Sequence, residues 1–449
     1  MKAVALSVLA FHRIARTRVA RNIVANYAGS AISAAAPLIA VPFLVRALGQ
    51  SMWGLVAFAT VLVSTLAILN SGLAQSMVRE IGIRWSLGDG GRSATRRLIF
   101  SYERIYWIAA LLITAMVFPF AGLIVNRWLN VEGVPPGIAT ASVQLAIALF
   151  FVQLPSAIYR TTLSALQAQV VQNGVQVAAA IIKAIGGVTI ALMTRSIIAY
   201  LAWLVVVSAL ETLALAVLAW RQMPGGRAGL GWDAAEVRKT LQFSATMSLV
   251  VMLGMATTMV DKFYVSGQFP IAQLGVYSIA ASVGLGVLQV SYPIFNAVLP
   301  RLVEVGGDAA ARRRANVKLL GIIGAIVILF GAAYLVAGDF ALSLWLQDRA
   351  LSDQVRQVLD LILISSALNM VYNIGYTNWV SLGESRWVAS INVVSFVAAL
   401  IVTPISIHLF GLKGAAAALI AINSIGAVSS IVWLLLSGSR GRSLVSDKS

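Results

Sequence analysis

Charged side chains inside long apolar stretches are the residues of this sequence that most need a chemical explanation. They are Arg160, Lys183, Lys262, Arg356, Glu211, Asp261 and Asp360. If these stretches cross a bilayer, a charge near its centre costs about 3 kcal/mol or more, so each should face a partner or a water-filled cavity. The pattern therefore predicts sites that bind charged ligands or ions.

Lys183 and Glu211 lie on either side of a short turn near Arg195. Lys183 precedes the turn by about eleven residues and Glu211 follows it by about fifteen, so both should lie near mid-depth on adjacent antiparallel helices. A structural ion pair and a cargo or coupling-ion site both remain open. If the two side chains do not face each other, Lys183 is the best single candidate for contacting an anionic substrate.

Asp261 and Lys262 are neighbours close to the outer end of a predicted span, 241–265. Adjacent helical positions point about 100° apart, so one of the two can face a cavity and the other a neighbouring helix or lipid headgroups. Arg46 supplies a positive charge at similar depth earlier in the chain. For Arg46 and Arg160, the alternative to substrate contact is snorkelling to the membrane interface.

The remaining polar residues suggest no catalytic group, metal site or cofactor. Arg356 and Asp360 are four residues apart and are expected to neutralise each other at a helix entrance. The chain has no cysteine, and its two histidines, His12 and His408, are far apart. The chain has two glycine-rich loops, at 88–92 and 224–227. Neither is followed by the Lys-Ser/Thr of a phosphate-binding loop, so nucleotide binding is not expected.

The composition indicates an all-α polytopic membrane protein. The 449 residues are 59% hydrophobic and 11% charged, with a mean hydropathy of +0.89, too little polar surface for a soluble domain. Crossing about 30 Å of hydrocarbon takes roughly 20 helical residues. About twelve stretches are long enough, and the predicted spans are 22–45, 52–74, 105–126, 138–163, 170–194, 197–219, 241–265, 271–298, 319–346, 356–380, 388–410 and 413–437.

The distribution of positive charge predicts the orientation of these spans. The net charge is +17, but about 24 of the 33 Lys and Arg fall in segments on one side and about five on the other. Both termini are therefore expected in the cytoplasm, and nucleic acid is not an expected partner. The longest loops, 75–104, 220–240 and 299–318, are too short for a soluble catalytic domain, and residues 1–21 are expected to form an interfacial lead-in to the first span.

An internal repeat divides the chain into two halves of about six spans each. The matching stretches are 42–58 with 261–278, 70–79 with 292–301, and 159–167 with 376–384. Because six is even, the halves enter from the same side and form parallel repeats around a central cavity, the arrangement expected for alternating access. The predicted parts are the N-terminal segment 1–21, the halves 22–219 and 241–437, the linker 220–240 and the tail 438–449.

Short motifs throughout the chain resemble a known family. These motifs are Asn26-Tyr27-Ala28-Gly29, Leu48-Gly49, Trp53-Gly54, Gly72-Leu73, Arg79, Asp261-Lys262-Phe263, Leu274-Gly275-Val276-Tyr277-Ser278-Ile279-Ala280 and Phe410-Gly411-Leu412-Lys413-Gly414-Ala415-Ala416. In their order and spacing, the sequence resembles polysaccharide-biosynthesis flippases of the multidrug/oligosaccharidyl-lipid/polysaccharide (MOP) exporter superfamily, in the O-antigen and exopolysaccharide branch. It departs from the lipid II flippase branch, which generally has fourteen spans.

This resemblance implies a transporter in the bacterial cytoplasmic (inner) membrane, not an enzyme. Its substrate would be an undecaprenyl-diphosphate-linked glycan, moved to the periplasmic leaflet, with polysaccharide polymerase and export proteins as possible partners. The basic residues placed to contact the diphosphate are Lys183, Lys262, Arg46 and Arg160. The carboxylates proposed for ion coupling are Asp261 and Glu211.

Two alternatives share this helical plan. An ion-coupled antiporter exporting small cationic drugs or metabolites would be expected to carry carboxylates in its first span. Span one of this chain contains no Asp or Glu, and the embedded charge is on balance basic. A scaffold in an envelope complex, without transport, is the other alternative.

Overall fold

The structure is a computed structural model of the 449-residue chain. It describes residue 29 and residues 31–68, 71–227, 230–232, 234–306 and 308–446. Within these ranges, the side chains of 71–76, 79, 234–248, 250 and 437–446 are not described. The predicted N-terminal segment 1–21, His12 and the Asn26-Tyr27 part of the family motif lie outside the described residues.

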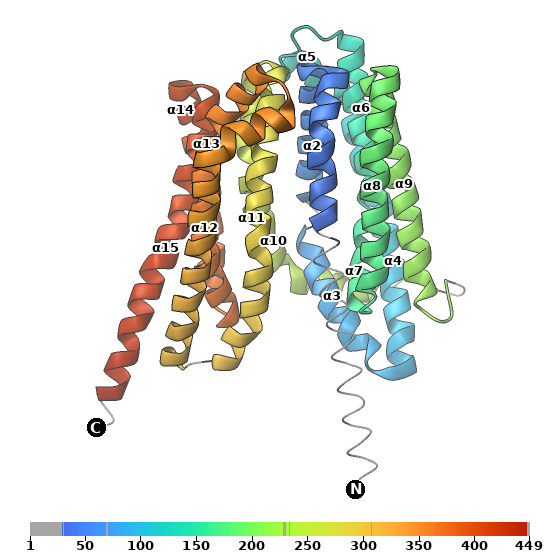
Figure 1. Ribbon diagram of the computed structural model, residues 1–449. Helices are drawn as coiled ribbons and strands as arrows, with labels where there is room; N and C mark the ends of the chain where they lie inside the picture. The colour runs from blue at the N-terminus through green and yellow to red at the C-terminus, as the bar shows by residue number, and fades with distance from the viewer. Residues whose placement is uncertain are drawn as a thin grey trace, which may run out of the picture. The chain divides into compact units, whose positions relative to one another are not determined.

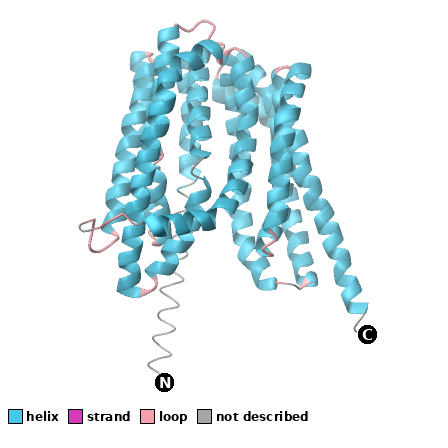
Figure 2. Cartoon of the chain, turned by 180° about the vertical axis from the view of Figure 1, so that it is seen from behind, coloured by secondary structure: helices cyan, strands magenta, loops and turns pink. Residues whose placement is uncertain are grey.

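The described chain is helical throughout (Figures 1 and 2). A first helix covers Ala31–Leu48. It is followed by α2 (Gln50–Ala67), α3 (Ser71–Trp85), α4 (Gly88–Val117), η2 (Phe118–Phe120), α5 (Ala121–Arg127), α6 (Pro136–Gln153), α7 (Ser156–Ala165), α8 (Gln169–Thr194), α9 (Ile197–Arg221), α10 (Ala234–Gln268), α11 (Ile271–Val305), α12 (Ala309–Leu346), α13 (Arg349–Ser381), α14 (Ser385–Phe410) and α15 (Leu412–Ser446).

Among the described residues, 11 helical segments are long and apolar enough to cross a membrane. The further predicted span, 241–265, falls within α10. The predicted class, an all-α polytopic membrane protein, is therefore confirmed. The predicted span 138–163 is interrupted where α6 ends at Gln153 and α7 begins at Ser156; Pro155 between them has no backbone N–H to donate.

Two of the predicted cytoplasmic loops are largely helical, which corrects the sequence analysis. The range 75–104 belongs mostly to α3 and the start of α4, and the range 299–318 is divided between α11 and α12. Asp308 starts α12 by accepting hydrogen bonds from the backbone N–H of Ala310 and Ala311. Hydropathy placed the ends of the neighbouring predicted spans next to basic residues. A helix can continue past the hydrocarbon, because long basic side chains reach the interface.

Contacts divide the chain into two units. One unit contains residues 1–40, 69–121 and 141–248, and the other contains 41–68, 122–140 and 249–449. The second unit thus includes α2 from the predicted N-terminal half. The division into halves at 220–240 stays a prediction.

Within the second unit, α2 packs against α11 through a reciprocal glycine contact. A Cβ on Gly54 would lie 1.9 Å from the carbonyl oxygen of Ile271, and a Cβ on Gly275 would lie 3.2 Å from that of Gln50. Gln50 and Gly54 have the same spacing as Ile271 and Gly275. In a contact with two-fold symmetry, equivalent residues of the two partners exchange the same contacts, as the glycine of each helix does here with the carbonyl of the other. This packing therefore agrees with the internal repeat.

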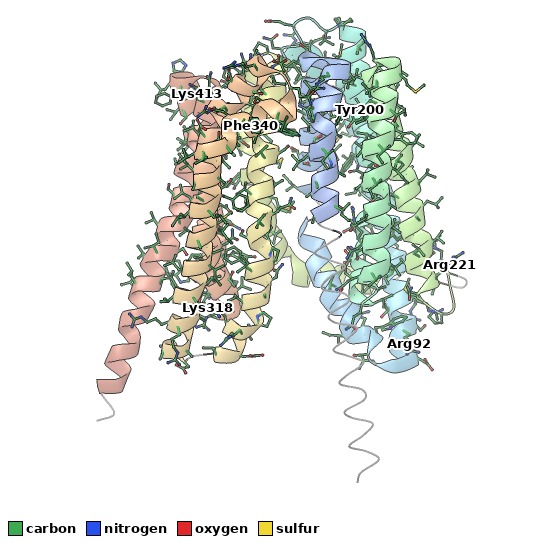
Figure 3. All side chains as sticks on the ribbon, viewed as in Figure 1. Arg92, Tyr200, Arg221, Lys318, Phe340 and Lys413 are labelled. Carbon is green, nitrogen blue, oxygen red and sulfur yellow. The ribbon has the colours of Figure 1, made fainter. Side chains whose placement is uncertain are left out.

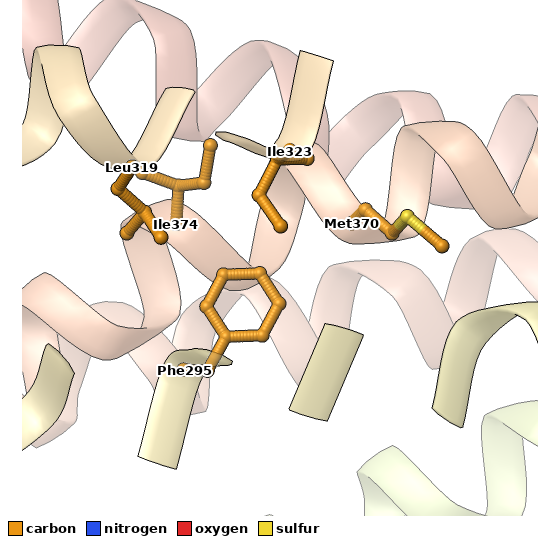
Figure 4. Close-up of a cluster of buried hydrophobic side chains, with 5 residues drawn as sticks. All are labelled: Phe295, Leu319, Ile323, Met370 and Ile374. Atoms are coloured by element: carbon orange, nitrogen blue, oxygen red, sulfur yellow. The ribbon is translucent and has the colours of Figure 1, made fainter. Parts of the chain in front are cut away.

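A buried apolar cluster joins α11, α12 and α13 in the same unit (Figure 4). It consists of Phe295, Leu319, Ile323, Met370 and Ile374. Next to it along α12, the buried Arg312 donates to the carbonyl oxygens of Leu302 and Gly306 at the end of α11 and to the side chain of Asn378 in α13. These contacts hold α11, the helix that carries Tyr277, against its neighbours.

Candidate functional site

A tight turn between α8 and α9 determines that Lys183 and Glu211 lie at a similar depth. Helix α8 ends at Thr194, Arg195 adopts a left-handed conformation with φ of 49°, and the Ser196 side chain accepts a hydrogen bond from the backbone N–H of Ala199 to start α9. With so short a connection, α8 and α9 are antiparallel neighbours. Lys183 and Glu211 therefore face each other, which is one of the two arrangements that the sequence analysis left open.

The Glu211 carboxylate lies between two cations. Lys183 Nζ lies 2.7 Å from Glu211 Oε2, and Arg160 NH1 lies 3.9 Å from Oε1. Arg160 also donates to Ser156 Oγ at 2.5 Å, one turn earlier on α7. The Glu211 side chain is 10% exposed, whereas Lys183 and Arg160 are 22% and 36% exposed. Two positive charges against one negative charge leave the cluster with a net charge of about +1.

The second charged cluster joins α10 to α11. Asp261 is 1% exposed and accepts a hydrogen bond of 2.6 Å from the hydroxyl of Tyr277. Lys262 Nζ lies 3.4 Å from both Asp261 oxygens and donates to the Thr258 carbonyl at 2.9 Å. One carboxylate therefore faces one cation, and the cluster is neutral.

Arg46 lies apart from both clusters. Its guanidinium donates to the carbonyl oxygen of Leu346 at 3.3 Å, at the last residue of α12. A cation at a helix C-terminus interacts favourably with the unpaired carbonyl groups there. The structure therefore brings Lys183, Arg160 and Glu211 together, and Asp261 with Lys262; the roles of all five and of Arg46 stay predictions.

The expected pairing of Arg356 with Asp360 is wrong. Arg356 forms an ion pair with Asp339 of α12, and Asp360 accepts a hydrogen bond of 2.5 Å from Tyr334. Helix α12 packs against α13 and offers these partners across the helix interface. Spacing along one helix could not reveal them.

Three polar residues at these helix interfaces were missed by the sequence analysis. Tyr277 was singled out only as part of a Gly-aromatic pair, and Ser156 was not considered. Glu103 was overlooked because the predicted third span began at 105, yet it is buried and accepts hydrogen bonds from Tyr159 at 2.5 Å and Arg227 at 2.6 Å. Extending each apolar span by one helical turn would have found Glu103.

Within the described ranges, no group of three or more His, Asp or Glu side chains is arranged to hold a metal ion. The two clusters instead combine carboxylates with Lys, Arg and Tyr donors and with a Ser hydroxyl that accepts from Arg160. Such groups can bind anions, exchange protons or stabilise one another.

Comparison with solved structures assigns the fold. The chain superposes on a lipid II flippase, MurJ, in an inward closed conformation, with a TM-score of 0.74 and 11% identity over 92% of this chain and 89% of that one. It also matches an inward-facing multidrug resistance MATE family transporter of the MOP superfamily, with a TM-score of 0.69 and 12% identity over 90% and 94% of the two chains. The chain therefore has the fold that these two proteins share.

The sequence comparisons name the family. Residues 43–349 match the model of the "Polysaccharide biosynthesis protein" family, and the chain belongs to this family. A curated relative, the putative O-antigen transporter of Shigella flexneri, is 24% identical over 406 residues, which cover 88% of this chain and 93% of that protein. The chain is thus a multi-pass transporter of polysaccharide biosynthesis, not an enzyme, and a distant homologue of an O-antigen transporter.

Proposed function

We propose that this protein is a flippase that moves an undecaprenyl-diphosphate-linked oligosaccharide across the bacterial cytoplasmic membrane by alternating access, with both termini in the cytoplasm. The observation that carries the proposal is the cluster of Lys183, Arg160 and Glu211. It holds an excess positive charge within membrane-spanning helices. A diphosphate is the anionic part of such a substrate and complements this charge.

The exposure of the cluster supports a binding role over a purely structural one. Lys183 and Arg160 are partly exposed, whereas the carboxylate between them is nearly buried. An anion can therefore approach the two cations without first displacing Glu211. In this proposal Glu211 holds both cations in place. When the diphosphate binds, the two cations interact with it as well as with Glu211.

The reciprocal contact of α2 with α11 supports alternating access. It joins the start of α2, in the predicted N-terminal half, to the start of α11, in the predicted C-terminal half. Arg46 with Leu346 and Gln50 with Gln354, whose side chains are 3.0 Å apart, add polar contacts between the same two halves. We propose that these contacts close the periplasmic side and separate when the substrate is released.

The second cluster is the proposed site of ion coupling. Asp261 is buried and hydrogen-bonded to Tyr277, so a change in its protonation or ion occupancy would change the contact between α10 and α11. Lys262 is the accompanying candidate for substrate contact. Polysaccharide polymerase and export proteins are the proposed partners downstream.

The decisive experiment measures which leaflet holds the lipid-linked oligosaccharide in cells depleted of this protein. Accessibility of the glycan at the periplasmic face is compared after complementation with wild type or Lys183→Gln at matched membrane abundance. The flippase proposal expects precursor to accumulate on the cytoplasmic side in depleted cells and in the Lys183→Gln strain. Normal periplasmic exposure with new sensitivity to cationic compounds would instead support an antiporter.

A further inference from the structure

A lateral groove on the first unit lies outside both charged clusters described above. Two cavities, of about 380 and 240 Å³, share the lining residues Leu213, Ala216 and Arg227. Arg221 also lines the larger one, and Glu103 and Trp107 on α4 line the smaller one. Because they share lining residues on α9, we treat the two cavities as one groove along this helix, with α4, α6 and α7 lining its smaller part.

The middle of this groove is apolar and open on its outer side. Leu213 is 60% exposed, Val217 is 42% exposed and Trp107 is 37% exposed. Leu213 lies two helical turns from Arg221, a distance of about 12 Å at 1.5 Å per residue. An apolar groove of this length in a membrane-spanning region suits part of an acyl chain.

Two arginines, Arg221 and Arg227, line the larger cavity; Arg221 is labelled in Figure 3 at the end of α9. Arg227 stacks on Trp220 at 4.9 Å and donates to Glu103, and Arg104 lies 4.3 Å above the ring of Phe100, which contacts Trp220.

Arg96 adds a further positive charge, because its guanidinium packs against Gly225 in the turn after α9. Among the residues that line the two cavities, Glu103 is the one carboxylate, and Tyr159 and Arg227 both bind it. Arg221 and Arg227 together against Glu103 leave one net positive charge for a ligand, and the guanidinium of Arg227 has further N–H donors beyond the one bound to Glu103.

We propose that this groove binds an anionic phospholipid, with its phosphate at Arg221 and Arg227 and an acyl chain along Leu213 and Val217. Basic pockets between membrane helices recognise anionic headgroups through this combination of charge and apolar depth. Glu103 is a positioning residue, because it holds Arg227 at the edge of the groove. The predicted orientation puts this end in the cytoplasmic leaflet.

The test titrates the detergent-purified full chain with phosphatidylglycerol or phosphatidylcholine and counts bound lipids by native mass spectrometry. Wild type is expected to bind phosphatidylglycerol more tightly than phosphatidylcholine. Arg221→Gln should weaken phosphatidylglycerol binding about fivefold, the effect of one basic side chain near a membrane surface. Leu213→Trp should weaken it by a similar factor because the indole fills the groove.

Two variants serve as matched controls. Leu210 is 59% exposed on the same helix but lines neither cavity, so Leu210→Trp should bind lipid like wild type. Arg314→Gln removes an exposed arginine of α12 and should also bind normally. Equal binding of the two lipids by wild type, or undiminished phosphatidylglycerol binding by Arg221→Gln, would overturn the proposal even if Leu213→Trp failed to fold.

Discussion

The clusters on α7–α9 and on α10–α11 each bury one carboxylate, but they surround it differently. Glu211 faces two cations, Lys183 and Arg160, whereas Asp261 faces one cation and the neutral hydroxyl of Tyr277. The first cluster has positive charge left over, and the second has none. The difference suggests a division of labour, in which one cluster recognises an anion and the other responds to a proton or cation.

The burial of the two carboxylates differs in the same direction. Glu211 retains some exposure, whereas Asp261 is almost completely enclosed. A ligand can reach the cations around Glu211 directly. It can reach Lys262 beside Asp261 as well, since that side chain is 22% exposed, but the Asp261 carboxylate itself is enclosed between α10 and α11.

The largest expected effect is that of Glu211→Ala. It leaves Lys183 and Arg160 without their shared carboxylate, and breaking a buried pair in this way costs about 3–5 kcal/mol. We expect a large loss of thermal stability in detergent and of membrane abundance. Glu304→Ala, at an exposed carboxylate near the end of α11, should change stability by no more than about 0.5 kcal/mol.

Replacing both members of the pair separates stability from transport. Lys183→Met with Glu211→Met should recover part of the lost stability, because apolar side chains of similar size can replace a buried ion pair, although Arg160 stays without its carboxylate. Glycan exposure at the periplasmic face should remain impaired. Normal flipping by a stable double variant would reduce this cluster to a structural pair.

The next largest effect is expected on the rate of flipping, in a comparison of the two lysines. Lys183→Gln should lower the initial rate of flipping at least about tenfold, because a hydrogen bond to a charged group contributes about 1.5–3 kcal/mol. Lys262→Gln should lower it less than about threefold, because the charge it removes is already matched by Asp261. The measurement is a leaflet assay in reconstituted vesicles, and a larger effect of Lys262→Gln would reverse the proposed division of labour.

Asp261→Asn should have a smaller effect on stability than Glu211→Ala. The amide still accepts a hydrogen bond from Tyr277, and one cation is left behind instead of two. We expect a loss of about 1–3 kcal/mol, the range for a disturbed buried polar group. Thermal unfolding measures the loss, and the dependence of flipping on an imposed proton or sodium gradient should disappear in this variant; a retained gradient dependence would exclude Asp261 as the coupling group.

The smallest effects are expected at the neutral partners of the two clusters. Tyr277→Phe removes the hydroxyl that binds the enclosed Asp261, and Ser156→Ala removes the hydroxyl that accepts from the more exposed Arg160. Both losses should fall near 1 kcal/mol, with Tyr277→Phe the larger because its partner cannot turn to water. Chemical denaturation of the purified variants can rank them, and the opposite order would show that burial is not what distinguishes the clusters.

Sequence reasoning worked where the chain itself imposes the geometry. A short turn between two apolar helices forces them to be antiparallel, and this put Lys183 and Glu211 at a similar depth on adjacent helices, while the structure showed that they face each other. Sequence reasoning failed for Arg356 because only the same helix was searched for a partner, and the partner, Asp339, lies across the interface with the preceding helix α12. It also failed at helix boundaries, since hydropathy stopped at the arginines of α4 and α12 although both helices continue.

The amino-acid sequence by itself determined that this protein is a bundle of membrane-spanning helices. Apolar stretches of this length must satisfy their backbone hydrogen bonds internally, and only helices do so within a single segment. Tertiary structure decided which charges are shared. The second cation at Glu211 and the contact of Glu103 with Arg227 each join segments that are not consecutive, and the Tyr277 hydroxyl reaches Asp261 across the interface of α10 and α11. All three contacts therefore depend on how the helices pack and not on spacing along one helix.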